Sequence, residues 1–503
     1  MTDAQGGVLP GVAIVVTNEE TGLFREVVTG PGGSYFVSQI VPGPYRVSAK
    51  LEGFKSLDRR GIVLLVGQTT TLDLTLEVGT VAESVTVTGE SPIIDLSTTE
   101  VGGHISSDEL QELPAANRNY MAFVGNVPGT VFVPSGEFLN DSFQANGQPT
   151  AANAIIFDGS NNTDEQRGSN VGGQTRAANE SIQEVQVMTN QFDAEYGRAS
   201  GAVINAVTKS GTNKFRGSAF GFFTGKTLTA RDVFAVANNS EKLDVGKEEW
   251  GGTFGGPIKQ NRLFFFGSVE RLVAKRNWSR TFTARPEFSY SVASEESAWN
   301  TLWRVDHQIS QNHTWAFRWL REIAPQFNRL DGAQETESSY GDETDLDQTL
   351  VGTLTSVLSN TKVNTVRVGA VTEDTVHANP AWRALHPAYA RCVPCPADAG
   401  LGIINAPPRL DYETFDIQAA TTMDYSIQRS YSFENTFSWF IPDKKGRHDT
   451  KAGARYSRTW LSNPNWANMN GSYQFANYQD RPFDPADPRS YPQRLTIRVP
   501  GPL

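Results

Sequence analysis

Long two-faced segments, arranged in pairs, constrain the fold of this chain more than any other feature of its sequence. They follow one another between residues 250 and 460, and a short polar turn joins the two members of each pair. In one segment, Trp315, Phe317 and Trp319 alternate with Thr314, Ala316 and Arg318. Successive side chains of a β-strand point to opposite faces, so these segments predict antiparallel strands with one apolar and one polar face.

The length of the segments favours a sheet that crosses a membrane. Each segment comes near the roughly 9–11 residues that a tilted strand needs to cross a bilayer, whereas strands in soluble proteins have about 5–6 residues. No run of about 18 apolar residues occurs, which excludes a transmembrane helix. An apolar outer face and a polar inner face are typical of a membrane β-barrel. A soluble sandwich or surface adhesin is the alternative.

The connections between the predicted strands differ in length on the two sides of the sheet. The turns KQNR, ISQN and SNTK are short, as periplasmic turns are. The stretches 322–344 and 375–430 are long and polar, and we expect them to be extracellular loops. The expected fold class is therefore mainly β, with an antiparallel transmembrane β-barrel from residue 216 to residue 503.

The composition narrows the function classes. The formal net charge of −11 speaks against a nucleic-acid partner, which needs a basic patch or stripe. The 503 residues suffice for several domains, and the 45 glycines with 10% aromatic residues favour strands and turns over helix bundles. No zinc-peptidase, serine-hydrolase or P-loop pattern occurs. We expect no enzymatic activity, no catalytic residue, no cofactor and no metal site.

The sequence of residues 1–79 predicts a small β-sandwich of short strands separated by turns. The expected strands lie in VAIVVTN, REVVTG, SYFVSQI, PYRVSAKLEGF and TLDLTLEV. In the last of these, Leu72, Leu74, Leu76 and Val78 alternate with polar residues, which predicts one buried face. The stretch GGSYFVSQIVPGPYRVSAKLEGF resembles the carboxypeptidase regulatory-like domain, which implies a transthyretin-like sandwich. Carbohydrate-binding modules share a related fold, so sugar binding and a passive spacer role both stay open.

The sequence of residues 91–215 predicts a compact mixed α+β domain. Ser106 and Glu109 form a capping box before a short helix, and NYMAFVGNVPG predicts a second helical turn that ends at Gly125. The dipeptides NG and DG in ANGQPTAANAIIFDG predict tight turns that flank a strand. Two further strands are expected at 182–188 and 202–208.

The order of these motifs resembles the plug domain of TonB-dependent outer-membrane receptors. The resemblance is carried by ANGQ, IIFDG and the run IQEVQVMTNQFDAEYGRASGAVINAVTKSGTNKFRG. Together with the preceding sandwich, it resembles the Oar-like branch of that family. The implied domains are 1–79 as the sandwich with its first strand missing, 80–90 as a linker, 91–215 as the plug, and 216–503 as a partial barrel. We recognise about ten strands, whereas transporters of this family have about 22, so the chain is expected to be a fragment.

A short segment between the sandwich and the plug resembles the TonB box. It comprises Glu83, Ser84, Val85, Thr86, Val87 and Thr88, in the sequence AESVTVTGESPII. An exposed, unpaired segment of this kind can add as a strand to the sheet of a partner, although an additional strand of the sandwich is the alternative. The resemblance implies TonB as a partner, the outer membrane with its lipid as the location, and import of an extracellular siderophore, oligosaccharide, peptide or cobalamin. An adhesin or carbohydrate-binding module without active transport is the competing function.

Four further residues are candidates for structural roles. In plugs, acidic and arginine side chains pair with charges of the barrel wall, so Glu195 and Arg198 are expected to lock the plug. Cys392 and Cys395 form a C-x-x-C pair that could be a disulfide, a redox site or half a zinc site. We expect a disulfide in an extracellular loop. The amino terminus lacks the basic and apolar regions of a signal peptide, and we expect that signal to be missing from this chain.

Overall fold

The computed structural model describes three β-rich parts that follow one another along the chain. The residues that the structure describes form a subset of the chain. These are residues 1–37, 40–79, 84–88, 101–113, 118–133, 142–164, 174–197, 199–231, 233, 236, 241–242, 245–282, 286, 289–329, 341–378, 409–411, 416–417, 421–441, 448–462, 465–467, 472–475, 486, 488 and 492–496.

The first part is a small sandwich whose main sheet has the strand order β3-β2-β4-β5-β7. Ile14 and Val16 of β2 are buried while their neighbours are partly exposed, which is the predicted alternation. A parallel pair, β1 and β6, covers one side of the core. The strands are β1 (Thr2–Asp3), β2 (Ala13–Asn18), β3 (Phe24–Val28), β4 (Gly43–Lys50), β5 (Ser56–Leu64), β6 (Thr75–Leu76) and β7 (Ser84–Thr88).

Two sequence-based expectations for this sandwich were wrong. No strand occurs in the described residues of SYFVSQI. Strand β5, in contrast, was not predicted, because a bulge next to Gly61 (φ +75°) breaks the two-residue period of its sequence. In TLDLTLEV only Thr75 and Leu76 form a strand, and Val78 is 70% exposed rather than buried with Leu74 and Leu76.

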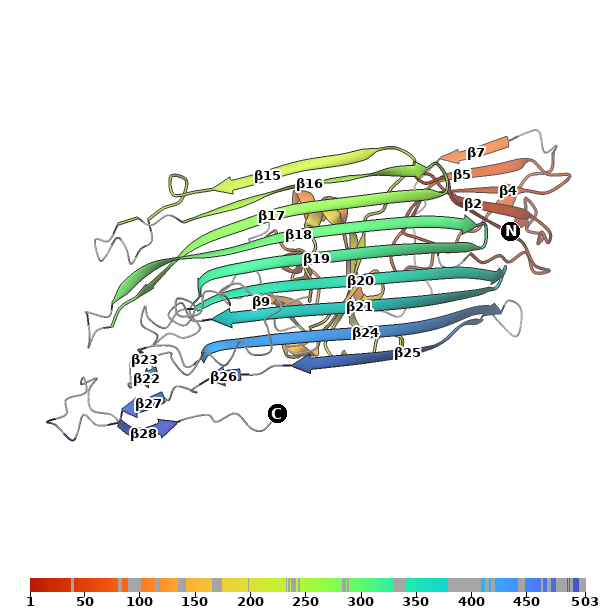
Figure 1. The fold of residues 1–503 in the computed structure, drawn as a ribbon. Helices are drawn as coiled ribbons and strands as arrows, with labels where there is room; N and C mark the ends of the chain where they lie inside the picture. Colours follow the sequence, from red (N-terminus) through yellow and green to blue (C-terminus); the bar gives the residue numbers. More distant parts are fainter. Residues whose placement is uncertain are drawn as a thin grey trace.

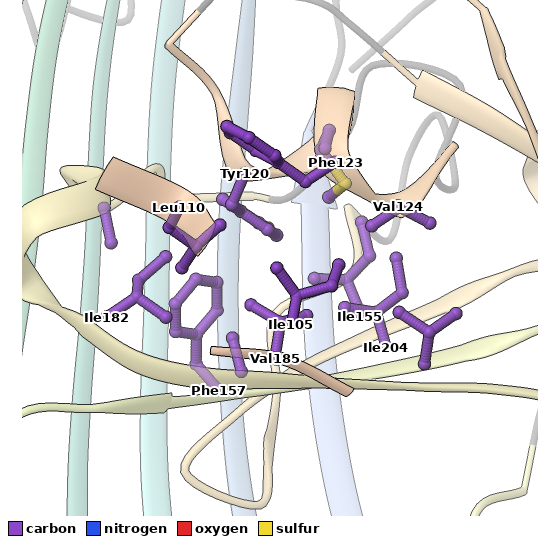
Figure 2. Packing of buried hydrophobic residues seen from close by; sticks show 14 of the residues in the cluster. Ile105, Leu110, Tyr120, Phe123, Val124, Ile155, Phe157, Ile182, Val185 and Ile204 are labelled. Carbon is purple, nitrogen blue, oxygen red and sulfur yellow. The ribbon is translucent and has the colours of Figure 1, made fainter. Parts of the chain in front are cut away.

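The second part, called here the inner domain (residues 101–208), has a five-stranded mixed sheet with the order β12-β11-β14-β13-β8. Two short helices pack on one face, where Tyr120, Phe123 and Val124 meet Ile155 and Phe157 (Figure 2). The elements are β8 (Val101–Ser106), α1 (Ser107–Glu112), α2 (Tyr120–Val124), β9 (Thr130–Val133), β10 (Ser142–Ala145), η1 (Thr150–Ala152), β11 (Ala154–Phe157), β12 (Ser160–Asn161), η3 (Asn179–Ser181), β13 (Ile182–Asn190) and β14 (Val203–Thr208).

The local predictions for the inner domain are confirmed. Ser106 caps α1, with its side chain accepting from the Glu109 N–H while the Glu109 carboxylate accepts from the Ser106 N–H. The second helix ends at Gly125 as expected. None of the helices that the structure describes has the length and apolar character needed to cross a membrane.

The third part is a ten-stranded antiparallel sheet of long strands, which curves around the inner domain (Figure 1). We call it the barrel wall. Its path runs β15-β16-β17-β18-β19-β20-β21-β24-β25, with β26 paired to β24. The strands are β15 (Arg216–Thr224), β16 (Gly246–Lys259), β17 (Leu263–Arg280), β18 (Tyr290–Ser310), β19 (His313–Arg329), β20 (Gly341–Ser359), β21 (Lys362–Ala378), β24 (Thr421–Ile441), β25 (His448–Ser462) and β26 (Asn465–Ala467).

The two faces of the barrel wall are those predicted from the alternation. Phe317 is 38% exposed on the outside, whereas its neighbour Arg318 is 3% exposed on the inside. Trp303 pairs with Trp319 across β18 and β19, and further outward aromatic side chains follow on β24 and β25. The outer face is therefore apolar and the inner face carries charged and polar groups, as a membrane barrel requires.

The barrel strands are longer than predicted. β19 runs to Arg329 and β20 begins at Gly341, so both ends of the expected loop 322–344 belong to strands. The burial alternation continues through Glu322, Ala324 and Gln326. The polar members Glu322 and Gln326 therefore belong to an inner face and not to a loop. β21 and β24 likewise shorten the expected loop 375–430. A small separate sheet has the order β23-β22-β27-β28, with β22 (Arg409–Asp411), β23 (Asp416–Ile417), β27 (Ser472–Phe475) and β28 (Pro492–Thr496).

The three parts are in contact with one another. Phe266, Leu302 and Leu320 of the wall complete the apolar core of the inner domain. The sandwich lies at the end of the wall that carries the short turns (Figure 1), where Phe36 stacks on Phe440 with 4.3 Å between ring centroids. The inner domain is therefore enclosed by the wall on one side, and the sandwich lies next to the short-turn end.

Candidate functional site

The contact surface between the inner domain and the barrel wall is the candidate site, and a tight turn places its central group. Asp158 and Gly159 form the two-residue turn between β11 and β12, both with positive φ (+47° and +75°). This is the hairpin turn that Asp-Gly favours. A side chain at Gly159 would collide with the guanidinium group of Arg367 on the wall, so the turn and the wall approach closely.

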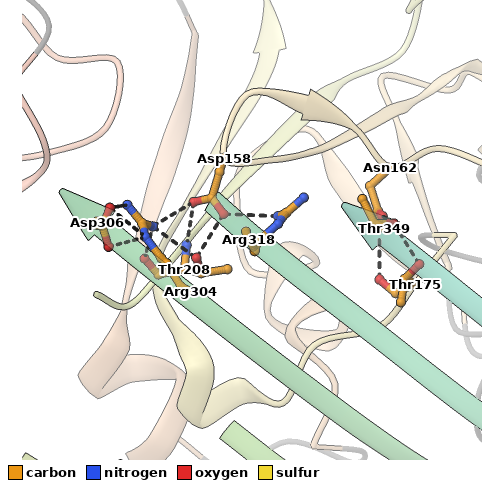
Figure 3. Close-up of polar contacts among 8 residues, drawn as sticks. All are labelled: Asp158, Asn162, Thr175, Thr208, Arg304, Asp306, Arg318 and Thr349. Atoms are coloured by element: carbon orange, nitrogen blue, oxygen red, sulfur yellow. Dashed lines mark hydrogen bonds and ion pairs between the residues drawn. The ribbon is translucent and has the colours of Figure 1, made fainter. Parts of the chain in front are cut away.

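Asp158 holds two arginines of the wall (Figure 3). Arg304 Nη1 lies 3.3 Å from Oδ1 of Asp158, and Arg318 Nη1 lies 3.1 Å from Oδ2. The backbone N–H and the hydroxyl of Thr208 each donate to the same carboxylate at 2.9 Å, and Asp306 forms the second ion pair of Arg304 at 2.9 Å. Because these groups are largely shielded from water, their charge-assisted hydrogen bonds are among the strong ones.

Two arginines of the inner domain form ion pairs of the opposite polarity. Arg118 contacts Glu180 in its own domain and Glu249 of β16, with 2.8 Å between its Nε and Oε1 of Glu249. Arg176 contacts Glu322 of β19 through two side-chain hydrogen bonds, one of them 2.7 Å from Nε to Oε2. Arginines of the wall thus pair with a carboxylate of the inner domain, and arginines of the inner domain pair with carboxylates of the wall. This pattern of charges fixes the register of the inner domain in the wall.

Further hydrogen bonds extend the contact along β20, β21 and β24. The hydroxyls of Thr175 and Thr349 lie 2.9 Å apart, and Thr349 also donates to Asn162 at 3.3 Å (Figure 3). Gln174 donates to Glu373 at 2.9 Å and accepts from Gln428 at 3.0 Å. These bonds join inner-domain residues to three wall strands, so the contact is polar over most of its breadth.

Burial changes the electrostatics of this surface. It raises the pKa of the Glu180 carboxyl above its usual value, against the opposing effect of Arg118. It also lowers the pKa of the nearby Lys209 ammonium, which Glu180 partly offsets. Some buried polar atoms of the contact have no hydrogen-bond partner among the described residues, namely Oε2 of Glu180, Oε2 of Glu270, Oδ1 of Asn300 and both side-chain polar atoms of Asn179. Such atoms gain hydration when the surfaces part, which lowers the cost of separation.

The sandwich contacts the inner domain as well. The Val66 N–H donates to Oε2 of Glu184 at 3.1 Å, and the other oxygen of Glu184 lies 2.6 Å from Nδ1 of His104. Glu184 is buried on β13, while His104 belongs to the neighbouring strand β8. One carboxylate therefore connects the sandwich to the first strand of the inner domain.

The residues predicted from sequence meet different outcomes. Glu195 lies 2.8 Å from Nζ of Lys451 on β25, an exposed ion pair, while Arg198 lies outside the described residues. Cys392 and Cys395 also lie outside them. Within the described part of the chain, no group of three or more His, Cys, Asp or Glu side chains is placed to hold a metal ion.

The TonB-box candidate is placed differently from our expectation. Glu83 lies outside the described residues, and Ser84–Thr88 form β7, which pairs with β5 in parallel. The expectation of an unpaired segment was therefore wrong for this structure, which has the segment as an additional strand of the sandwich.

Sequence reasoning missed Asp158, Arg118, Arg176, Arg304 and Arg318. The DG dipeptide was recognised only as a turn, although its aspartate carries the central contact. Arg318 was recognised as an inward residue of the alternation, but no sequence pattern indicates which inner-domain group it meets. The pairing partners are distant in the chain, so only the folded structure reveals them.

A wall of long two-faced strands around a smaller mixed domain, with buried ion pairs between the two, defines an outer-membrane β-barrel with an internal domain. This chain belongs to the outer membrane β-barrel domain family, whose model matches residues 207–289 and 280–491. The carboxypeptidase regulatory-like domain matches residues 1–77. The protein is accordingly located in the outer membrane.

Several known proteins resemble the chain. It is 29% identical over 293 residues to the TonB-dependent transporter Oar of Myxococcus xanthus, which covers 55% of this chain and 26% of Oar. The outer-membrane transporter YddB of Escherichia coli has a TM-score of 0.55 at 13% identity, covering 74% of this chain and 50% of YddB. The ferric enterobactin receptor PfeA of Pseudomonas aeruginosa, solved as a mutant, has a TM-score of 0.54 at 12% identity, covering 75% and 51%. The chain thus spans about a quarter of Oar and about half of the two solved transporters.

Proposed function

We propose that this chain is part of a TonB-dependent receptor that binds an extracellular ligand and imports it across the outer membrane. In this proposal residues 91–215 are the plug, residues 216–503 belong to the barrel, and residues 80–90 are the segment that TonB engages. The energy comes from the proton gradient of the inner membrane through TonB. The ligand is a siderophore, an oligosaccharide, a peptide or cobalamin.

The polar contact between inner domain and wall is the observation that carries the proposal. Among the described residues, only three wall side chains join the large apolar cluster of the inner domain, namely Phe266, Leu302 and Leu320. A permanently fixed domain would be expected to bury a much larger apolar surface against its wall, because apolar burial is the main source of stability. Here ion pairs and hydrogen bonds centred on Asp158, Arg118 and Arg176 join the inner domain to wall strands from β16 to β24. Such groups are solvated by water when they separate, so the inner domain can shift without exposing a large apolar surface.

The chain path supports a mechanical connection from the coupling segment to the plug. Residues 84–88 precede β8, and β8 is the edge strand of the inner sheet, paired with β13. An edge strand has one neighbour and leaves a sheet more readily than a central strand. A pull transmitted along residues 89–100 therefore acts first on β8, and through it on the ion-paired surface.

Binding of the purified TonB carboxy-terminal domain tests the role of the coupling segment. The variant Val87→Pro removes a backbone N–H donor and fixes φ, so it should weaken binding at least about tenfold. The matched control is Thr71→Pro, in an exposed irregular stretch of the sandwich, which should bind like the parent protein. Unchanged binding of Val87→Pro contradicts the proposed role of this segment.

Uptake in cells separates transport from adhesion. Cells that make the protein are offered a labelled ferric siderophore, cobalamin, an oligosaccharide and a peptide, with and without a functional TonB. The transport proposal expects accumulation of one of them that disappears without TonB. An adhesin would retain its ligand at the cell surface equally in both strains.

A further inference from the structure

The segment Ser84–Thr88 is held by the sandwich in this structure. It forms β7, a strand of 5 residues that runs parallel to β5, with Leu57 opposite Val85 and Arg59 opposite Val87. The sheet order ends at β7, so its outer edge pairs with no other described strand. Figure 1 shows β7 as the outermost strand of this sheet. The proposed coupling segment is therefore stored as a strand before any partner arrives.

The sandwich that stores the segment is itself attached to the barrel. Arg25 donates to the carbonyl of Gln311, in the turn between β18 and β19, at 2.8 Å. The backbone N–H of Asn213, just before β15, donates to the carbonyl of Glu20 at 2.9 Å. For as long as β7 stays on β5, the sandwich therefore takes up a pull on β7 and spreads it over its contacts with the barrel and with Glu184 of β13, and residues 89–100 carry little of it.

The β5–β7 ladder is suited to reversible opening. It is short, it lies at the edge of the sheet, and it is parallel, which makes each pair slightly less stable than in an antiparallel ladder. While it is closed, it also covers the edge of β5, which would otherwise be open to unwanted strand pairing. A partner that offers a longer antiparallel edge can compete for the same five residues.

We propose that the sandwich stores the coupling segment on β5 and that TonB acquires it by strand exchange, so that β7 leaves β5 when TonB binds. This inference rests on the proposed function and adds a regulatory step to it. Simple addition of a TonB strand to the outer edge of β7 would leave the load on the sandwich and its barrel contacts. Exchange transfers the load to residues 89–100 and hence to β8.

A reversible staple between β5 and β7 tests the exchange. The double variant Leu57→Cys with Val85→Cys places two cysteines at directly paired positions. The control staple is Val15→Cys with Ser48→Cys, which joins β2 to β4 in the same sheet. Each variant is produced in the same way as the parent protein, and mass spectrometry confirms the new disulfide. Binding of the TonB carboxy-terminal domain is then measured with the disulfide oxidised and with it reduced.

Exchange predicts that the oxidised β5–β7 staple binds TonB at least about tenfold more weakly than its reduced form, because the binding-competent fraction falls. The control staple should bind equally in both states. Equal binding by the oxidised and reduced β5–β7 staple overturns the exchange. If the parent and the reduced protein do not bind TonB either, the proposed function fails, and that outcome is recognisable before the staple is oxidised.

Hydrogen exchange gives a second readout that does not depend on a disulfide. In the parent protein alone, the amides of 84–88 that point toward β5 should be protected, because they belong to the ladder. On addition of the TonB domain, β5 should lose protection along its β7 edge while 84–88 remain protected in the new pairing. Two results would contradict storage and exchange: unprotected 84–88 in the parent alone, or unchanged protection of β5 on binding.

Discussion

Arg318 of the barrel wall donates to Asp158 of the inner domain, with 3.1 Å between Nη1 and Oδ2. The arginine side chain is 3% exposed and the carboxylate 17%, so the pair is shielded from water and salt. Arg304 contacts the other carboxylate oxygen at 3.3 Å. One acidic side chain thus serves as counterion for two buried guanidinium groups. Without it Arg304 keeps Asp306, whereas Arg318 loses the carboxylate that it contacts.

The variant Asp158→Asn should destabilise the inner domain within the barrel by about 3 kcal/mol, since breaking a buried pair leaves an uncompensated charge. The measurement is urea unfolding of the inner domain, followed by hydrogen exchange of the β11, β13 and β14 amides. Asp73→Asn, at an exposed position of the sandwich, is the control and should unfold like the parent. A loss below about 0.5 kcal/mol, typical of surface changes, would show that Asp158 does not hold the two arginines.

The pair Arg176 and Glu322 should show strong energetic coupling across the same surface. Arg176→Met and Glu322→Leu should each cost about 3 kcal/mol, because each leaves the other charge buried alone. The double variant should cost clearly less than the sum, with a coupling energy of about 1–3 kcal/mol. Urea midpoints of all four proteins provide this cycle, and additive losses would mean that the two side chains act independently.

Glu180 should make the stability of the inner domain depend on pH. Burial raises the pKa of its carboxyl above the ordinary 4.5, so the folded state binds this proton more tightly than the unfolded state. The contribution of this carboxyl to the free energy of unfolding is therefore present below pH 4.5, and it is lost as the pH rises through the raised pKa of the folded state. In the variant Glu180→Gln, the urea midpoint should change less with pH over that interval than it does in the parent protein. A parallel pH dependence in the two proteins would assign the effect to another group.

A charge on the outer face of the wall should oppose membrane insertion. Val368 on β21 is 51% exposed, and Val368→Arg should cost up to about 2–4 kcal/mol if the side chain lies near the middle of the bilayer. Asn312→Arg, in the exposed turn between β18 and β19, is the control. Folding into vesicles, scored by the heat-dependent gel mobility of barrels, should be impaired by the first variant alone. Equal folding of the two variants would argue against lipid contact at Val368.

Sequence patterns predicted most of the barrel wall, because its strands obey a simple rule. Outward Phe317 and inward Arg318 are neighbours, and the two-residue period alone places them on opposite faces. The capping box at Ser106 and the turn at Asp158 follow equally local rules. The strand ends were harder to predict, since inward polar residues such as Glu322 look like loop residues in a sequence.

The contacts between domains could not be predicted in the same way. Arg176 and Glu322 are 146 positions apart, and no local rule relates them. β7 shows a second limit, because its alternation fits a strand of any sheet and does not reveal that β5 is its neighbour. The bulge at Gly61 hid β5 itself. Long-range pairing depends on the fold as a whole, which a single sequence does not display residue by residue.

Lipid accessibility of neighbouring wall positions tests the central claim that this sheet is embedded in the membrane around the inner domain. Spin labels are placed at Phe317→Cys, Leu320→Cys and Asn312→Cys of the protein in vesicles, and their collision with oxygen and with an aqueous nickel complex is measured. The account predicts that position 317 meets oxygen and not nickel, position 312 meets nickel, and position 320, which is fully buried, is shielded from both. Shielding of position 317 from oxygen, or its free access to nickel, would contradict the account.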